Sequence, residues 1–75
     1  MVTIHRAQGL RVVIFVDDHE PAHVHVFGDG QAKINLIGPE LIWAEGMKRS
    51  DVRRAMKIVA EHREQFLIRW RQIHG

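Results

Sequence analysis

The spacing of apolar residues changes near residue 50, and this change constrains the fold more than any other feature of the chain. Before it, apolar side chains run together in "LRVVIFV" (10–16) and alternate with polar ones in "HVHVF" (23–27), as in β-strands. After it, they recur at three- and four-residue steps to about His74, which is typical of an amphipathic helix. Ser50 is placed to cap the start of that helix.

Glycine-containing turns divide the first part of the chain into short strands. The "GDG" segment at 28–30 predicts a hairpin, because glycine tolerates the positive φ that tight turns require. The "AKINLI" segment at 32–37 predicts the returning strand, and "LIWA" at 41–44 is short enough for an edge strand. Thr3 to His5 is expected to begin the same strand as residues 10–16, broken near Gly9 by a bulge or turn.

Together these patterns predict a single α+β domain over residues 1–75. We expect an antiparallel meander of three or four strands with a histidine-rich loop in residues 1–47. It packs against one long C-terminal helix in residues 50–74. Two bulky residues off the main helix stripe, Ile58 and Ile68, leave room for a second apolar contact such as a homodimer.

The chain has 75 residues and no cysteine, so its core is small and disulfides are excluded. Domains of this size often depend on a metal ion or a partner for stability. The lack of cysteine and of a signal-type leader predicts a cytoplasmic protein. No membrane segment is expected, because the longest apolar run is the five residues from Val12 to Val16.

Charge is unevenly distributed along the chain. Residues 1–47 carry three basic and six acidic groups, whereas residues 48–75 carry eight basic and three acidic groups. A basic C-terminal helix indicates an anionic partner, either nucleic acid or an acidic protein, although charged residues also cover ordinary exposed helix faces. For nucleic acid, the predicted phosphate contacts are Arg49, Arg53, Arg54 and Lys57.

The residues that are missing restrict the chemistry. There is no cysteine or tyrosine, and the only hydroxyl side chains are Ser50 and Thr3, far along the chain from most histidines. Covalent catalysis normally needs such a nucleophile. If the protein is an enzyme, acid–base or metal chemistry remains.

The segment "DDHEPAHVH" (17–25) concentrates the groups that such chemistry uses, with three of the six histidines of the chain. His23 and His25 are two apart on a strand, so they point the same way with Cα atoms about 6.6–6.8 Å apart. His19 and Asp18 lie on the preceding loop, which a bend at Pro21 folds back toward the pair.

Three interpretations of this segment remain open. His23 and His25 with His19 or Asp18 match the three-ligand pattern of catalytic zinc, so a divalent metal is one cofactor to consider. Without any cofactor, the imidazoles form an acid–base pair that cleaves RNA, oriented by Asp18. Otherwise the two histidines are only the polar face of a half-exposed strand.

Arg63 interrupts the apolar stripe of the predicted helix. A guanidinium at this position extends past the helix to solvent, pairs with a carboxylate or points into a cleft. In the acid–base interpretation it stabilises the extra negative charge of a phosphorane, and the predicted catalytic set is then Asp18, His19, His23, His25 and Arg63.

The text "GLRVVIFVDDHEPAHVHV", followed by "QAKINLI", resembles the small bacterial domain of unknown function 4160. That family typically shows a glycine, an apolar strand, an Asp-His-x-Pro-x-His-x-His-Val segment and a C-terminal helix. The matching positions here are Gly9, Asp18, His19, Pro21, His23, His25 and Val26, with Trp70 in the helix. The chain departs from the pattern with Ala22 and Val24 around the first histidine of the pair, and with Phe15 where tyrosine is frequent.

The resemblance implies the toxin half of a bacterial type II toxin–antitoxin module. Members are commonly encoded beside a second small domain of unknown function, the 2442 type, which would be the antitoxin partner. Small toxins of this kind are often ribonucleases, which here implies a metal-independent ribonuclease acting through the histidine cluster. The alternative is a non-enzymatic module that binds protein or nucleic acid through its basic helix.

Overall fold

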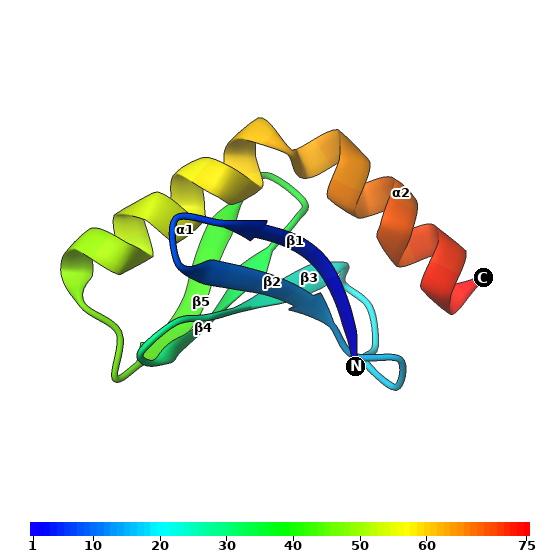
Figure 1. Ribbon diagram of the computed structural model, residues 1–75. Helices are drawn as coiled ribbons and strands as arrows, with labels where there is room; N and C mark the ends of the chain where they lie inside the picture. Colours follow the sequence, from blue (N-terminus) through cyan, green and yellow to red (C-terminus); the bar gives the residue numbers. More distant parts are fainter.

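The computed structural model describes residues 1–75 as one antiparallel sheet with two helices on the same side (Figure 1). The strands follow chain order, each paired with the next: β1 (Val2–Ala7), β2 (Leu10–Ile14), β3 (His23–Phe27), β4 (Gln31–Asn35) and β5 (Glu40–Glu45). The helices are α1 (Arg49–Glu61) and α2 (Arg63–His74). The expected α+β class and meander topology are confirmed, whereas the numbers of strands and helices are not.

The first two strands form a hairpin, so the sheet has five strands rather than three or four. Gln8 and Gly9 both adopt positive φ, 53° and 76°, and Ala7 pairs with Leu10 across them. A two-residue turn with two positive φ angles matches the twist of an antiparallel pair. The break expected near Gly9 is thus a hairpin turn, and residues 3–5 lie on a separate edge strand rather than on the strand of residues 10–16.

The C-terminal helix is divided at His62, where φ is −111° and ψ is 14°, so the expectation of one continuous helix was wrong. The Nδ1 atom of His62 donates to the carbonyl oxygen of Ile58 at 3.0 Å, and that oxygen also accepts the His62 amide. A side chain that enters the backbone ladder in this way bends a helix. The bend lets α1 and α2 follow the curved sheet (Figure 1). The helix begins at Arg49 with Lys48 as N-cap, two residues before the predicted cap Ser50.

The core lies between the sheet and the helices. The sheet contributes Leu10, Val12, Ile14, Val24, Val26, Ala32 and Ile34, and Leu36 follows β4. The helices contribute Ala55, Ile58, Val59, Phe66, Leu67 and Trp70. Ile58 is 3% exposed and belongs to this core, so of the two residues expected off the stripe only Ile68 lies at the surface, 50% exposed.

The opposite face of the sheet carries no helix (Figure 1). Strand register places Val13 opposite His25, His25 opposite Lys33, and Lys33 opposite Trp43, so these four residues form a row across β2 to β5. Paired residues share a face, and His25 thus lies away from the core, as the alternation of β3 predicts. Neither helix has the length and apolar character needed to cross a membrane.

Candidate functional site

The loop after β2 turns back sharply and holds Asp18 over the end of β3. The Asp18 amide donates to the carbonyl oxygen of Phe15 at 3.1 Å, and the Phe15 amide donates to Oδ2 of Asp18 at 3.3 Å. Aspartate commonly closes turns by such side-chain bonds. These two bonds therefore fix the position of the carboxylate independently of its contacts with the histidines.

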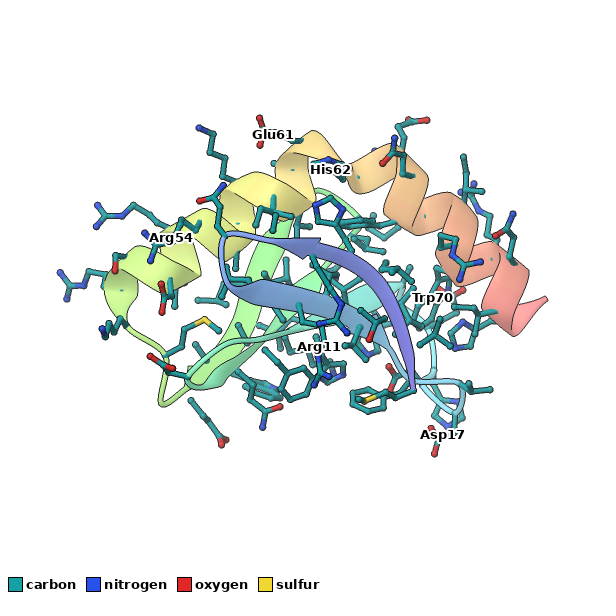
Figure 2. All side chains as sticks on the ribbon, viewed as in Figure 1. Arg11, Asp17, Arg54, Glu61, His62 and Trp70 are labelled. Atoms are coloured by element: carbon teal, nitrogen blue, oxygen red, sulfur yellow. The ribbon has the colours of Figure 1, made fainter.

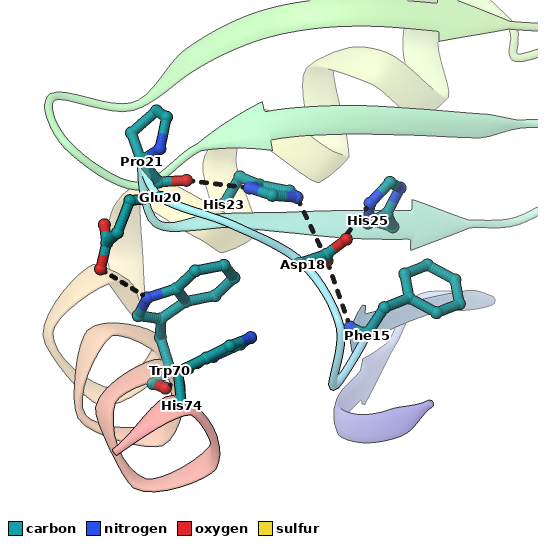
Figure 3. A network of polar contacts seen from close by, with 8 residues as sticks. All are labelled: Phe15, Asp18, Glu20, Pro21, His23, His25, Trp70 and His74. Atoms are coloured by element: carbon teal, nitrogen blue, oxygen red, sulfur yellow. Dashed lines mark hydrogen bonds and ion pairs between the residues drawn. The ribbon is translucent and has the colours of Figure 1, made fainter.

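Asp18 lies between the two histidines of β3 (Figure 3). Its Oδ2 atom is 3.1 Å from Nε2 of His23 and 3.7 Å from Nε2 of His25. The two imidazole centroids are 5.3 Å apart. We call Asp18, His23 and His25 the Asp–His–His cluster, since these residues offer three ligand atoms that lie within 4.8 Å of one another.

The hydrogen bonds of His23 determine what its ring offers to Asp18. Its Nδ1 atom donates to the carbonyl oxygen of Pro21 at 2.9 Å, so a neutral ring has its lone pair on Nε2. That lone pair lies beside a carboxylate oxygen, and Nε2 is buried without a hydrogen bond. Two acceptors at 3.1 Å require a cation between them, either a proton on Nε2 or a metal ion.

His25 is held as a neutral base. Burial lowers its pKa below the ordinary value of 6.5, the Asp18 charge raises it, and His23 and Lys33 lower it further. The edge of Phe15 covers the ring at a centroid distance of 4.7 Å, and Trp43 lies 6.1 Å away. Its Nδ1 atom is buried and has no partner. A neutral imidazole with an available lone pair is the form that binds metals.

A hollow of about 300 Å³ opens beside the cluster. Asp18 and His23 line it, together with Asp17, His19, Glu20, Pro21, Lys33 and Ile42. His19 is exposed on the rim and does not join the three grouped ligand atoms. The structure thus brings Asp18 to the histidine pair and leaves His19 at the entrance.

A second layer of aromatic contacts supports His23 from the helix side. Its ring lies 5.2 Å from Trp70 of α2, and Trp70 Nε1 donates to Oε1 of Glu20 at 3.2 Å. His74 stacks on the same indole at 3.8 Å (Figure 3). From the sequence, Trp70 was identified as a family-pattern position in the C-terminal helix, and nothing indicated its bond to Glu20.

The family model described as "Domain of unknown function (DUF4160)" matches residues 9–71. The chain belongs to the DUF4160 family. The matched region contains the whole Asp–His–His cluster and Trp70, and it leaves out β1 and the last residues of α2. No curated protein and no solved structure matches the chain.

The remaining predicted residues of this DUF4160 domain lie apart from the cluster. Arg63 donates through Nε to the carbonyl oxygen of Leu36 at 2.7 Å, which ties the start of α2 to the turn after β4. The predicted phosphate contacts occur at the start of α1, where Arg53, Arg54 and Lys57 surround an open surface with Ser50. Arg54 also pairs with Asp51. Figure 2 shows Arg54 and Asp17 at opposite ends of the molecule.

The face beside the cluster carries aromatic and basic side chains. Phe15, Phe27 and Trp43 are partly exposed there, and the Phe15 and Phe27 rings are 6.4 Å apart. The guanidinium of Arg11 lies 5.4 Å from the Phe27 centroid. Aromatic rings on an open sheet, interleaved with cations, are typical of surfaces that bind single-stranded nucleic acid. Sequence analysis did not identify this surface.

Proposed function

We propose that this DUF4160 protein is the toxin of a bacterial type II toxin–antitoxin module and acts on RNA at the Asp–His–His cluster. One observation carries the RNA proposal: the shared Asp18 carboxylate and both imidazoles lie beside an open sheet face of aromatic and basic residues. The toxin role and its antitoxin partner of the 2442 type derive from the resemblance to the family pattern.

The open face supplies the RNA contacts closest to the cluster. Phe27 and Trp43 offer rings for stacking, and stacking of one base contributes about 1–3 kcal/mol. Lys33 lies on β4, between the strands of these two rings, and Arg11 lies on β2 beside Phe27; both would attract phosphates, and Lys33 also lines the hollow beside Asp18. A strand of RNA lying on this face would place a phosphodiester near the entrance to the cluster.

The basic start of α1 is a second and more distant contact. Arg49, Arg53, Arg54 and Lys57 are all exposed, and no contact joins them to the cluster. We assign them to phosphates further along the RNA strand.

Arg63 has a supporting role, since its bond to Leu36 holds the turn that packs beside Ala22 and Pro21. The amide of Leu36 in turn donates to the carbonyl oxygen of Ala22 at 2.9 Å.

Direct proton transfer by both imidazoles fits this geometry less well than metal chemistry. A general acid or base must come within about 2.6–3.2 Å of the proton that it moves. Nδ1 of His23 is occupied by the Pro21 carbonyl oxygen, and its Nε2 atom is buried. Acid–base catalysis through His23 therefore requires the loop carrying Asp18 to open first.

Inducible expression in a bacterial host tests the proposed function. We expect the wild-type chain to arrest growth, a co-expressed antitoxin of the 2442 type to restore it, and Asp18→Asn to abolish the arrest at equal protein level. Asp17→Asn is the matched control, because it makes the same change at the adjacent exposed carboxylate. Growth arrest by Asp18→Asn equal to that of the wild type would show that the cluster is not the reactive centre.

A second candidate function, RNA binding without cleavage, is favoured by the separation of the basic α1 surface from the cluster. Purified protein incubated with labelled single-stranded RNA distinguishes the two. Cleavage that Asp18→Asn removes supports the enzyme. Intact RNA that is nevertheless retarded in a gel, in buffers with and without EDTA or added zinc, supports the binding module.

A further inference from the structure

We infer that Asp18, His23 and His25 form a three-ligand binding site for a divalent transition metal of the zinc class, with an open coordination position toward the hollow. As an account of the reactive centre, this inference rests on the proposed function. The binding of metal itself concerns only these side chains and is measured without RNA.

The distances fit such an ion. Zinc binds imidazole nitrogen and carboxylate oxygen at about 2.0–2.2 Å, so two ligand atoms at a tetrahedral centre lie about 3.3–3.5 Å apart. The two distances from Oδ2 of Asp18, 3.1 Å to His23 and 3.7 Å to His25, bracket that range. The three ligand atoms all lie within 4.8 Å of one another, so small side-chain rotations would complete the geometry.

The burial of His23 points independently to a ligand. Its side chain is 6% exposed, and its buried Nε2 atom lies 3.1 Å from Oδ2 of Asp18, a contact that needs a proton or a metal ion between the two atoms. A buried polar atom normally has a partner, and an orphaned lone pair beside a carboxylate is stabilised by a bound cation. When the ring is neutral, the site therefore offers a buried ligand atom that is directed at a second one.

Two of the three ligands, His23 and Asp18, are oriented by a further hydrogen bond, as in established metal sites. Metal-binding histidines usually donate their second nitrogen to a carbonyl or carboxylate, and ligating carboxylates are themselves hydrogen-bonded. The Pro21 carbonyl oxygen accepts from Nδ1 of His23, and the Phe15 amide donates to the carboxylate of Asp18. The Phe15 ring packs against His25 and keeps water from that side.

The ligand types select the class of metal. Two imidazoles and one carboxylate suit zinc and its neighbours in the first transition row, whereas magnesium and calcium prefer oxygen ligands alone. Three protein ligands leave a position for water, as in catalytic rather than structural zinc sites. The hollow lined by Asp18 and His23 is where that position would be reached.

Titration of the tag-free protein with Zn²⁺, Co²⁺ and Mg²⁺, by calorimetry and visible absorption, tests the inference. We expect one equivalent of Zn²⁺ or Co²⁺ to bind, with a tetrahedral Co²⁺ spectrum, and no binding of Mg²⁺. Asp18→Asn and His25→Gln should lose this binding, while Asp17→Asn and His19→Gln, which alter exposed neighbours, should keep it.

A measurement on the wild-type chain avoids variants that fail to fold. Long-range ¹H–¹⁵N spectra should show Nε2 of His23 and of His25 shifting when zinc is added, with Nδ1 of His23 remaining protonated and His19 unchanged. The absence of stoichiometric Zn²⁺ binding, or a spectrum in which His23 instead carries both protons beside Asp18 whether or not zinc is present, overturns the inference.

The outcomes separate the two proposals. If zinc bound as expected but the protein neither arrested growth nor acted on RNA, the metal site would be supported and the proposed function contradicted. If the protein bound no zinc and cleaved RNA completely in EDTA, the proposed function would be supported and the metal site contradicted.

Discussion

The indole nitrogen of Trp70 donates a hydrogen bond at 3.2 Å to a carboxylate oxygen of Glu20, fifty residues earlier in the chain. The same indole lies 5.2 Å from the ring of His23. Helix α2 is therefore tied both to the loop that carries Asp18 and to the first histidine of the cluster. The geometry of the cluster depends on the end of the chain as well as on the segment at 17–25.

Trp70→Phe tests the hydrogen bond between the indole and Glu20. The change removes the donor and part of the buried indole while keeping an aromatic ring. A lost hydrogen bond and a reduced core side chain together should lower the free energy of unfolding by about 2 kcal/mol. Urea unfolding followed by circular dichroism measures it. Glu20→Gln keeps an acceptor for the indole and should change stability much less, and equal losses in the two variants would contradict the assignment.

Gly30 is predicted to be the glycine least tolerant of a side chain. A Cβ atom at this position would lie 2.2 Å from the carbonyl oxygen of Glu45, whereas a Cβ atom at Gly9 would meet nothing within 4 Å. Gly30→Ala forces the β3–β4 turn away from the end of β5 and should cost about 3 kcal/mol. Gly9→Ala strains only its own backbone, at φ 76°, and should cost about 1 kcal/mol. Thermal unfolding of both variants provides the comparison, and the reverse order would be inconsistent with this packing.

The fold was largely predictable because the spacing of apolar residues indicates which face of each strand or helix is buried. The alternation in β3 correctly separated Val24 and Val26, which are in the core, from His25 on the other face. Two of the errors have local causes. Gln8 adopts a left-handed conformation without being glycine or asparagine, so the break expected near Gly9 was not recognised as a hairpin turn that begins a new strand. The helix bends at His62 without proline or glycine. The cause is a side-chain hydrogen bond to the carbonyl oxygen of Ile58, which cannot be inferred from the residue types.

The candidate site was predictable where its residues are close in sequence. Spacing placed His23 and His25 on one side of a strand, and the bend after Asp18 brought the carboxylate to them. The orientation of His23 depends on a backbone carbonyl oxygen at Pro21, which any sequence could supply. The contact with Trp70 spans the whole fold, so only the packed structure reveals it.

Acidification should destabilise the protein through His5. Burial lowers the pKa of His5 below 6.5, and the neighbouring His62, whose ring is 4.4 Å away, lowers it further. The unfolded chain then binds more protons than the folded one, so stability is complete above about pH 6.5 and declines as pH falls toward the lowered pKa. The melting temperature should be lower at pH 5.5 than at pH 7.5.

His5→Gln should reduce that pH dependence without removing it, because the lowered pKa of His25 acts in the same direction. His19→Gln removes an exposed histidine and serves as the control. A difference in melting temperature that is the same in the wild type and in His5→Gln would contradict the role of His5.

The two proposed RNA-binding surfaces should respond differently to salt. Arg53 is an exposed cation at the start of α1, and removing one phosphate contact by Arg53→Ala should reduce the slope of log Kobs against log salt by about one.

Trp43 lies on the open sheet face in the row of His25 and Lys33, where a base would stack on its ring. Trp43→Leu should weaken binding by about 1–3 kcal/mol at every salt concentration and leave the slope unchanged, since stacking releases no counterions. Fluorescence anisotropy of a labelled oligonucleotide over a salt series measures both quantities. Arg69→Ala, on α2 and bonded to Gln72, is the control for a lost surface charge. If Arg53→Ala and Arg69→Ala changed the slope equally, the attraction would come from net charge alone, and neither surface would be a specific site.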